Sequence, residues 1–254
     1  MKILLTNDDG IESEGLNVLV KVLRCTGHRV FVIAPDANRS GISHALSVFN
    51  SAIKLYPKEE DTWSFSGTPA DCVIAGLKGK FFDVPDLVLS GINQGENLGT
   101  DIIYSGTAGA ARQASLMGIP GIALSLSGWS GYHWDMSAAW VADHLEELYS
   151  LWREHAYLNV NIPNSAGGPS GIQMTWPAAK HYNDTFSVKY VPGGEIVCKL
   201  EGGEAAATEE TGSDCDVVSR NLVSVSVLYN FPAVRRDLCP GVPDYASVAP
   251  RNGS

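Results

Sequence analysis

The first 34 residues limit the possible folds more than any other part of the chain, because they predict a strand, a helix and a strand in direct succession. An apolar run at residues 3–5 and a β-branched run at residues 29–34 both have the pattern of buried strands. Between them, four apolar residues recur at helical spacing: Leu16, Leu19, Val20 and Leu23. A helix that returns the chain to the start of a neighbouring strand makes the two strands parallel. This segment therefore predicts a βαβ unit.

The same rhythm continues as far as residue 162. Further strand patterns occur at three places: residues 86–90, 120–126 and 157–162. Helical patterns occupy three more: residues 68–79, 107–118 and 135–154. Residues 46–65 have the pattern of short strands or of an excursion from the sheet. We therefore expect an α/β fold over residues 1–162, with a Rossmann-like, mostly parallel sheet and helices on both faces.

From residue 163 onward the composition changes: proline and glycine become more frequent, and strand-like segments replace the earlier alternation of strands and helices. Residues 221–231 alternate valine and serine, which predicts a strand with one buried face. Residues 240–254 show no periodicity and are expected to be a flexible tail. The sequence therefore predicts a β-rich C-terminal portion at residues 163–239, followed by the tail.

Charge and cysteine content narrow the range of functions. A formal net charge of -10 argues against binding to a nucleic-acid polymer, whose phosphate backbone selects basic surfaces. The five cysteines are scattered and form no CxxC pair, which fits reduced thiols in the cytoplasm. No segment has the pattern of a signal peptide or of a membrane span, which needs roughly 20 apolar residues. We expect a cytoplasmic protein that acts without a membrane.

Oxygen-bearing side chains follow three of the predicted strands. Asp8 and Asp9 come directly after the first strand, residues 36–43 after the second, and residues 90–97 after the strand at 86–90. The carboxyl ends of parallel strands share one edge of a sheet, where ligands of such folds bind. Taken alone, the two aspartates could equally well cap the next helix.

Together, these strand ends supply a set of residues that can all bind a metal through oxygen, with no imidazole and no thiolate: Asp8, Asp9, Ser40 and Asn93. Carboxylate, hydroxyl and carboxamide oxygens suit Mg²⁺ or Mn²⁺, or alternatively Ca²⁺, rather than zinc. A divalent cation would also allow an acidic protein to bind a phosphate ester. The sequence therefore predicts a metal site that leaves positions open for water and substrate.

A helix begins close to this edge, at Ser105, Gly106 and Thr107. The free N–H groups and the positive dipole end of a helix N-terminus bind anions. The alternative is an ordinary helix cap followed by small residues that pack tightly on the sheet. We predict phosphate binding at Ser105, Gly106 and Thr107, with Thr107 acting through its amide and hydroxyl, and we add Asn97 from the preceding loop.

Four long motifs show a family resemblance: NDDG at residues 7–10, APDANRSG at 34–41, GTPADCV at 67–73, and SGINQGENLGTDIIYSGTAGAA at 90–111. They resemble, in order, those of the SurE family of stationary-phase survival-protein phosphatases. The resemblance implies a metal-dependent phosphomonoesterase acting on nucleoside 5′- and 3′-monophosphates, and on short polyphosphate in some members. It also implies the metal and phosphate ligands given above, and a homodimer or homotetramer in which a C-terminal hairpin mediates oligomerisation.

Two departures from the family pattern concern Gln113, which stands where the family has an acid, and residues 193–212, which lack the expected aromatic residues. His44 follows the loop that carries Ser40 and either faces substrate or packs internally. The aromatic residues between Trp129 and Trp140 either stack on a nucleobase or pack in the core or between subunits.

Two other functional classes also place acids after a first strand. A receiver-like phosphoacceptor domain requires an aspartate at the end of a central strand, where this chain has Ser90 and Gly91. A phosphatase with a nucleophilic aspartate requires a DxD motif, whereas here the two acids are adjacent. We therefore favour attack on phosphorus by water, assisted by the metal and by Asp8 or Asp9.

Overall fold

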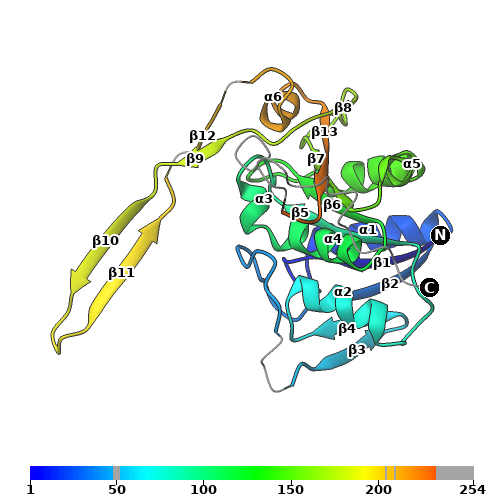
Figure 1. Ribbon diagram of the computed structural model, residues 1–254, viewed down its shortest axis with the longest axis horizontal. Helices are drawn as coiled ribbons and strands as arrows, with labels where there is room; N and C mark the ends of the chain where they lie inside the picture. Colours follow the sequence, from blue (N-terminus) through cyan, green and yellow to red (C-terminus); the bar gives the residue numbers. More distant parts are fainter. Residues whose placement is uncertain (48–51, 204, 209, 233–254) are drawn as a thin grey trace, which may run out of the picture.

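The structure is a computed structural model, and it describes residues 1–47, 52–203, 205–208 and 210–232 (Figure 1). The strands are β1 (Lys2–Thr6), β2 (Arg29–Pro35), β3 (Leu55–Glu59), β4 (Thr62–Phe65), β5 (Leu87–Gln94), β6 (Gly121–Leu126), β7 (Ala156–Ile162), β8 (Ile172–Met174), β9 (Lys180–Tyr182), β10 (Thr185–Tyr190), β11 (Ile196–Glu201), β12 (Ala205–Ala207) and β13 (Val223–Tyr229). The helices are α1 (Glu14–Cys25), α2 (Pro69–Lys78), α3 (Asp101–Tyr104), α4 (Gly106–Leu116), α5 (Trp134–Leu151) and α6 (Asp214–Ser219).

Nine strands of the described part of the chain form one sheet, in the order β3-β4-β2-β1-β5-β6-β7-β13-β8. The run from β4 to β7 is parallel throughout, whereas β3 and β13 are antiparallel to their neighbours β4 and β7. Strand β1 lies between β2 and β5, so the order reverses there, and such a reversal opens a crevice at the carboxyl ends of the strands. The predicted mostly parallel α/β sheet is confirmed.

Helices cover both faces of this sheet, as predicted. Helices α1 and α5 pack on one face, where Leu16, Leu19 and Leu23 of α1 are fully buried in the larger core cluster. Helices α2 and α4 pack on the other face, against a second cluster that contains Phe31 and Ile33. Thr68 and Asp71 form a capping box at the start of α2, in which each side chain bonds to the backbone of the other residue.

The strand predicted to have one buried face is buried on both faces over its first four residues, 223–226, and partly exposed beyond them. Ser224 and Ser226 of β13 have no exposed surface, and both lie 2.8 Å from the Thr175 hydroxyl oxygen. Helix α6 packs against β13 and β7, and Thr175 lies over the two serines, which accounts for the burial of this part of the strand. These serine hydroxyls can be buried because each of them hydrogen-bonds to the Thr175 hydroxyl.

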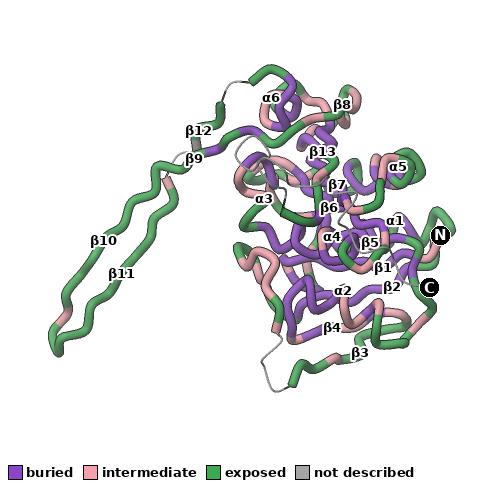
Figure 2. The backbone as a smooth tube through the Cα atoms, in the orientation of Figure 1, coloured by how far each residue is buried: buried purple, intermediate pink, exposed green. Residues whose placement is uncertain are grey.

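The region after residue 162 therefore shares the core sheet, through β8 and β13. Strands β9 to β12 leave it as a projecting segment that we call the arm (Figure 1). The outer part of the arm is the antiparallel hairpin of β10 and β11, and every residue in these two strands is exposed (Figure 2). The tail predicted at 240–254 lies outside the described residues.

Candidate active site

The turn after β1 is built by Asn7, which is fully buried. Its carboxamide accepts a hydrogen bond from the Gly10 amide at 3.2 Å and donates to the Gly10 carbonyl at 3.0 Å. Gly10 has a φ of 104°, in the left-handed region that favours glycine. This closed turn lets Asp8 and Asp9 leave the alternation of the strand, as the sequence requires for two adjacent acids to serve one site.

Asp8 is fixed by the first turn of helix α4. The Thr107 hydroxyl donates to Asp8 Oδ1 at 2.5 Å, and the Thr107 amide donates to Asp8 Oδ2 at 3.1 Å. Gly106 makes this approach possible, because a Cβ there would lie 2.9 Å from both Cβ and Oδ2 of Asp8. Thr107 was predicted to hold a phosphoryl group with these same donors, whereas here both of them hold a carboxylate.

The two aspartates bind protons more tightly than isolated carboxyl groups do. Burial raises the pKa of Asp8, whose side chain is almost fully enclosed, although its bonds to Thr107 act in the opposite direction. Burial also raises the pKa of Asp9 to about 6; the amide of Gln94, 3.0 Å from Asp9 Oδ2, opposes this shift, and the Asp8 charge adds to it. Burial therefore disfavours the charged form of both acids.

A bulge in β5 prepares the position of Asn93. The register against β6 shifts between Ser90 and Asn93, and an extra residue on one strand redirects the side chains that follow. Gly91 is required within the bulge, since a Cβ there would lie 2.2 Å from the Leu124 carbonyl oxygen. The Asn93 carboxamide donates to the Gly95 carbonyl at 2.9 Å, so its Oδ1 remains available as a ligand.

The loop after β2, which we call the Ser40 loop (residues 36–44), passes directly over the acidic turn. The Arg39 amide donates to the Asp8 carbonyl at 2.6 Å. Ser40 itself is exposed, and its amide donates to Asn38 Oδ1 at 2.8 Å. The loop thus brings the Ser40 hydroxyl to the edge where Asp8 lies.

Asn97 and Ser105 have structural partners of their own. The Asn97 carboxamide donates to Ser125 Oγ at 2.8 Å, and its backbone is held by the side chains of Asn159 and Asn161 at 2.8–3.1 Å. Ser105 is the N-cap of α4, and its hydroxyl accepts a hydrogen bond from the Ala108 amide at 3.0 Å. Both residues are buried at the floor of the site, where their carbonyl and amide groups define its shape.

Five of the eight predicted residues line one cavity of about 680 Å³: Asp8, Ser40, Asn93, Asn97 and Ser105. The other three lie against it, because Gly106 and Thr107 contact Asp8, and Asp9 accepts the hydrogen bond from Gln94, a lining residue. The structure therefore brings the predicted residues of all the strand ends to one place.

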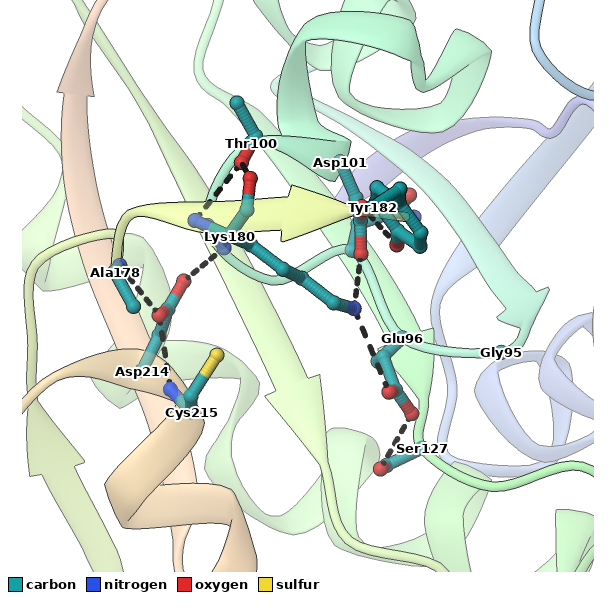
Figure 3. Close-up of polar contacts among 12 residues, drawn as sticks. Gly95, Glu96, Thr100, Asp101, Ser127, Ala178, Lys180, Tyr182, Asp214 and Cys215 are labelled. Atoms are coloured by element: carbon teal, nitrogen blue, oxygen red, sulfur yellow. Dashed lines mark hydrogen bonds and ion pairs between the residues drawn. The ribbon is translucent and has the colours of Figure 1, made fainter. Parts of the chain in front are cut away.

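The sequence reasoning missed the far wall of this cavity, which comes from the root of the arm (Figure 3). Lys180 Nζ lies 2.6 Å from Asp101 Oδ2 and 3.9 Å from Glu96 Oε1, and the Tyr182 hydroxyl donates to Asp101 Oδ1 at 2.5 Å. Burial alone would lower the pKa of Lys180, but the bond to Asp101 raises it overall, so the amine is charged. No periodic pattern marks residues 178–184, which explains why this wall escaped prediction.

The residues present fit a divalent cation. Asp8 and Asp9 supply two carboxylates, while Ser40 and Asn93 supply neutral oxygens, a set that suits a hard cation with several waters. Within the described ranges, no group of three or more His, Cys, Asp or Glu side chains could hold a metal ion, so the neutral oxygens would be needed. A cation would also balance the two acids whose pKa values burial raises.

A doubly wound sheet with an oxygen-lined cavity at the carboxyl ends of its strands defines an α/β protein of the kind that binds a ligand at this edge of the sheet. Comparison with known proteins gives the family. Residues 3–184 match the family model described as "Survival protein SurE", and the chain belongs to the SurE family.

Several relatives are similar over nearly the whole chain. The 5′-nucleotidase SurE of Cyanothece sp. is 36% identical over 247 residues, covering 91% of this chain and 92% of that protein. The 5′-nucleotidase SurE of Syntrophotalea carbinolica is 38% identical over 234 residues, covering 90% and 91%. The crystal structure of SurE protein from Aquifex aeolicus superimposes with a TM-score of 0.80 at 36% identity, covering 94% of this chain and 97% of that one.

A search for membrane spans gives no candidate: among the described residues, every helix is too short or too polar to cross a bilayer.

Proposed function

We propose that this protein is a metal-dependent phosphomonoesterase of the cytoplasm that hydrolyses nucleoside 5′- and 3′-monophosphates, and short polyphosphate as a secondary substrate. The observation that best supports this proposal is the contact between Asp8 and Thr107, which puts a buried carboxylate against the N-terminus of α4 beside the cavity. Relatives that share about a third of their residues are named 5′-nucleotidases, which supports the substrate class.

The charge of the cavity supports the metal requirement. Its lining contains three aspartates, Asp8, Asp101 and Asp184, but a single Lys or Arg side chain, Lys180, which Asp101 already neutralises. A phosphate dianion cannot enter an acidic cavity of this kind without additional positive charge. A bound Mg²⁺ or Mn²⁺ would neutralise the phosphoryl oxygens and make the attacking water more acidic.

The chain's own residues then have distinct tasks. Asp8, Asp9, Ser40 and Asn93 hold the cation. Ser105, Gly106, Thr107 and Asn97 are the proposed phosphoryl site at the positive end of α4, although the Thr107 amide and hydroxyl donate to Asp8 in this structure. Asp9, the more accessible of the two acids, or Asp8 assists removal of the proton from the attacking water.

The test is a phosphate-release screen over nucleoside 5′- and 3′-monophosphates and short polyphosphate, with Mn²⁺, with Mg²⁺ and with EDTA. We expect release from the monophosphates that EDTA abolishes and added metal restores. Full activity in a demonstrably metal-free sample would refute the metal requirement. A phosphoenzyme trapped after brief incubation would instead support a nucleophilic aspartate.

The hairpin of the arm supports a homodimer or homotetramer. Antiparallel register puts six side chains on one face of the hairpin: Phe186, Val188, Tyr190, Ile196, Cys198 and Leu200. Tyr190, Leu200 and Phe186 are 77%, 66% and 64% exposed. A two-stranded hairpin is marginally stable in water, and exposed apolar patches mark contact surfaces. We propose that this face is covered by a second copy of the chain.

A further inference from the structure

A set of three side chains, which we call the His44 clamp (His44, Arg112 and Gln113), joins the Ser40 loop to helix α4. The Arg112 Nε donates to His44 Nδ1 at 2.8 Å, and His44 Nε2 lies 2.8 Å from Gln113 Oε1. Because Nδ1 accepts, the ring proton belongs on Nε2, which donates to the Gln113 carbonyl oxygen. Both contacts are thus satisfied by one neutral tautomer of His44.

The backbone around the clamp is equally close. A Cβ on Gly109 of α4 would lie 2.9 Å from the Ser43 carbonyl oxygen and 3.1 Å from His44 Cα. Ser43 also holds the end of α3, since its amide donates to the Tyr104 carbonyl at 2.8 Å and its hydroxyl to the Ile103 carbonyl at 2.6 Å. The Ser40 loop is therefore attached both to α3, which precedes Ser105, and to α4, which follows it.

The other end of the same loop is tied to the acidic turn through the Arg39 amide and the Asp8 carbonyl. Ser40 stands between these two attachments and is itself exposed. The position of the Ser40 hydroxyl is consequently set by its attachments and not by packing around it.

We propose that His44 is a positioning residue: held by Arg112 and Gln113, it fixes the Ser40 loop on α4 and so sets the place of Ser40 relative to Asp8. The inference rests on the proposed function, because it assigns Ser40 to the cation site. It also explains why His44 is oriented toward α4 instead of toward a substrate.

The surroundings of His44 keep it neutral. Burial lowers its pKa below the ordinary 6.5; the bond to Gln113 opposes this shift, and the Arg112 charge adds to it. Gln113 and Ser43 carry no charge, and Tyr157 of β7, which feels the Arg112 charge, stays protonated because burial raises its pKa to about 12. Protonation of Nδ1 would remove the acceptor for Arg112 and set two cations against each other, which opens the clamp.

The experiment compares His44→Asn, Gln113→Glu and the control His28→Asn in the full-length protein. His28 is a matched control, since its Nδ1 contacts only the N-terminal amine at 3.3 Å, at the amino end of the strands. Three quantities are measured: the Mn²⁺ Kd by calorimetry, kcat/KM for a nucleoside monophosphate, and the titration of each histidine by NMR.

We expect His44→Asn to weaken Mn²⁺ binding and to lower kcat/KM, each by about tenfold. Gln113→Glu should raise the pKa of His44 relative to the wild-type protein, because a carboxylate favours the imidazolium, and should move the acid limb of the kcat/KM profile upward with it. His28→Asn should change none of these. The NMR spectra also report whether each variant is folded.

Two results would overturn the proposal: an unchanged Mn²⁺ Kd in folded His44→Asn, or an acid limb that stays in place while the pKa of His44 rises in Gln113→Glu. Failure of the proposed function is distinguishable, because a wild-type protein that binds Mn²⁺ but releases no phosphate refutes the phosphatase and still leaves the Kd comparison decisive for His44.

Discussion

At the scale of single residues, the bond between Asp8 and Thr107 changes what each is expected to do. Sequence motifs place an acid at 8 and a hydroxyl at 107, but they cannot show that two residues so far apart share a hydrogen bond of 2.5 Å. In the proposed metal site, Thr107 would therefore act on the cation through Asp8. If a substitution at Thr107 changes metal binding, Thr107 supports the metal site through Asp8; if it changes only substrate binding, Thr107 is a phosphate ligand alone.

Thr107→Ala should therefore weaken the metal site as well as turnover. It removes a hydrogen bond to a charged group, worth roughly 1.5–3 kcal/mol, so kcat/KM should fall about tenfold to a hundredfold and the Mn²⁺ Kd should rise. Thr107→Ser keeps the hydroxyl and serves as the control. Calorimetry and steady-state kinetics measure both effects, and an unchanged Mn²⁺ Kd in the alanine variant would show that Asp8 does not depend on Thr107.

Asp9→Asn should stabilise the metal-free protein at pH 7.5. The pKa of Asp9 is raised from 3.8 to about 6, so its contribution to stability is fully present below pH 3.8 and is lost as the pH rises through 6. Asparagine removes this penalty, which is at most about 3 kcal/mol. Thermal melts in EDTA and in Mn²⁺ test the idea: we expect a higher Tm than wild type in EDTA and a smaller gain on adding metal.

At the scale of elements, the sequence predicted those that are long or have strong apolar periodicity. Helix α1 and strand β2 follow the predicted pattern because their apolar residues face the core. Helices α3 and α6 were missed, since elements of 4 and 6 residues are too short to show a helical period. The bulge in β5 was also missed, because it depends on contact with β6, which only the folded sheet provides.

The candidate site was predicted in its composition but not in its full outline. Strand ends bearing Asp8, Asp9 and Asn93 could be identified because the sheet is parallel and its carboxyl ends coincide. The wall at Lys180 could not, because it depends on the arm folding back beside α3. Local sequence carries no information about a contact across 79 residues of chain.

Gly106→Ala should disable the site without unfolding the protein. A Cβ at this first position of α4 would press on Asp8, at 2.9 Å, and on Ile42 Cγ2, at 3.2 Å. We expect a loss of activity of about a hundredfold, since small displacements of catalytic groups have effects of this size. Gly167→Ala is the control, because nothing lies within 4 Å of its added Cβ. Steady-state kinetics give the activity of both variants, and circular dichroism shows whether each is folded. Equal activity of the two folded variants would contradict the close approach of Gly106 to Asp8.

At the scale of the whole molecule, the arm divides the chain into a body that buries its apolar residues and an extension that does not (Figure 2). The two faces of the hairpin differ, because Ser187 and Lys199 are register partners on the face opposite Phe186 and Leu200. This asymmetry fits the proposal that a second copy covers the apolar face while the polar face remains in water.

The double variant Phe186→Ser, Leu200→Ser should therefore form a smaller assembly in solution than the wild-type protein. It removes the two apolar partners nearest the root of the hairpin while leaving the core sheet intact. Light scattering after gel filtration should give a lower mass than wild type, whereas the control Ser187→Ala, Lys199→Ala should keep the wild-type mass. A wild-type protein that is monomeric at high concentration would refute the proposed assembly.

The root of the arm has a consequence for how the molecule behaves in dilute solution. The segment that carries the exposed hairpin also supplies Lys180 and Tyr182 to the cavity wall. In the proposed assembly a second copy covers the hairpin, so dilution below the concentration at which chains associate would uncover the hairpin and release the segment that carries Lys180 and Tyr182. Specific activity should accordingly fall on dilution and return when the protein is concentrated, so that the number of chains present sets how well each one works.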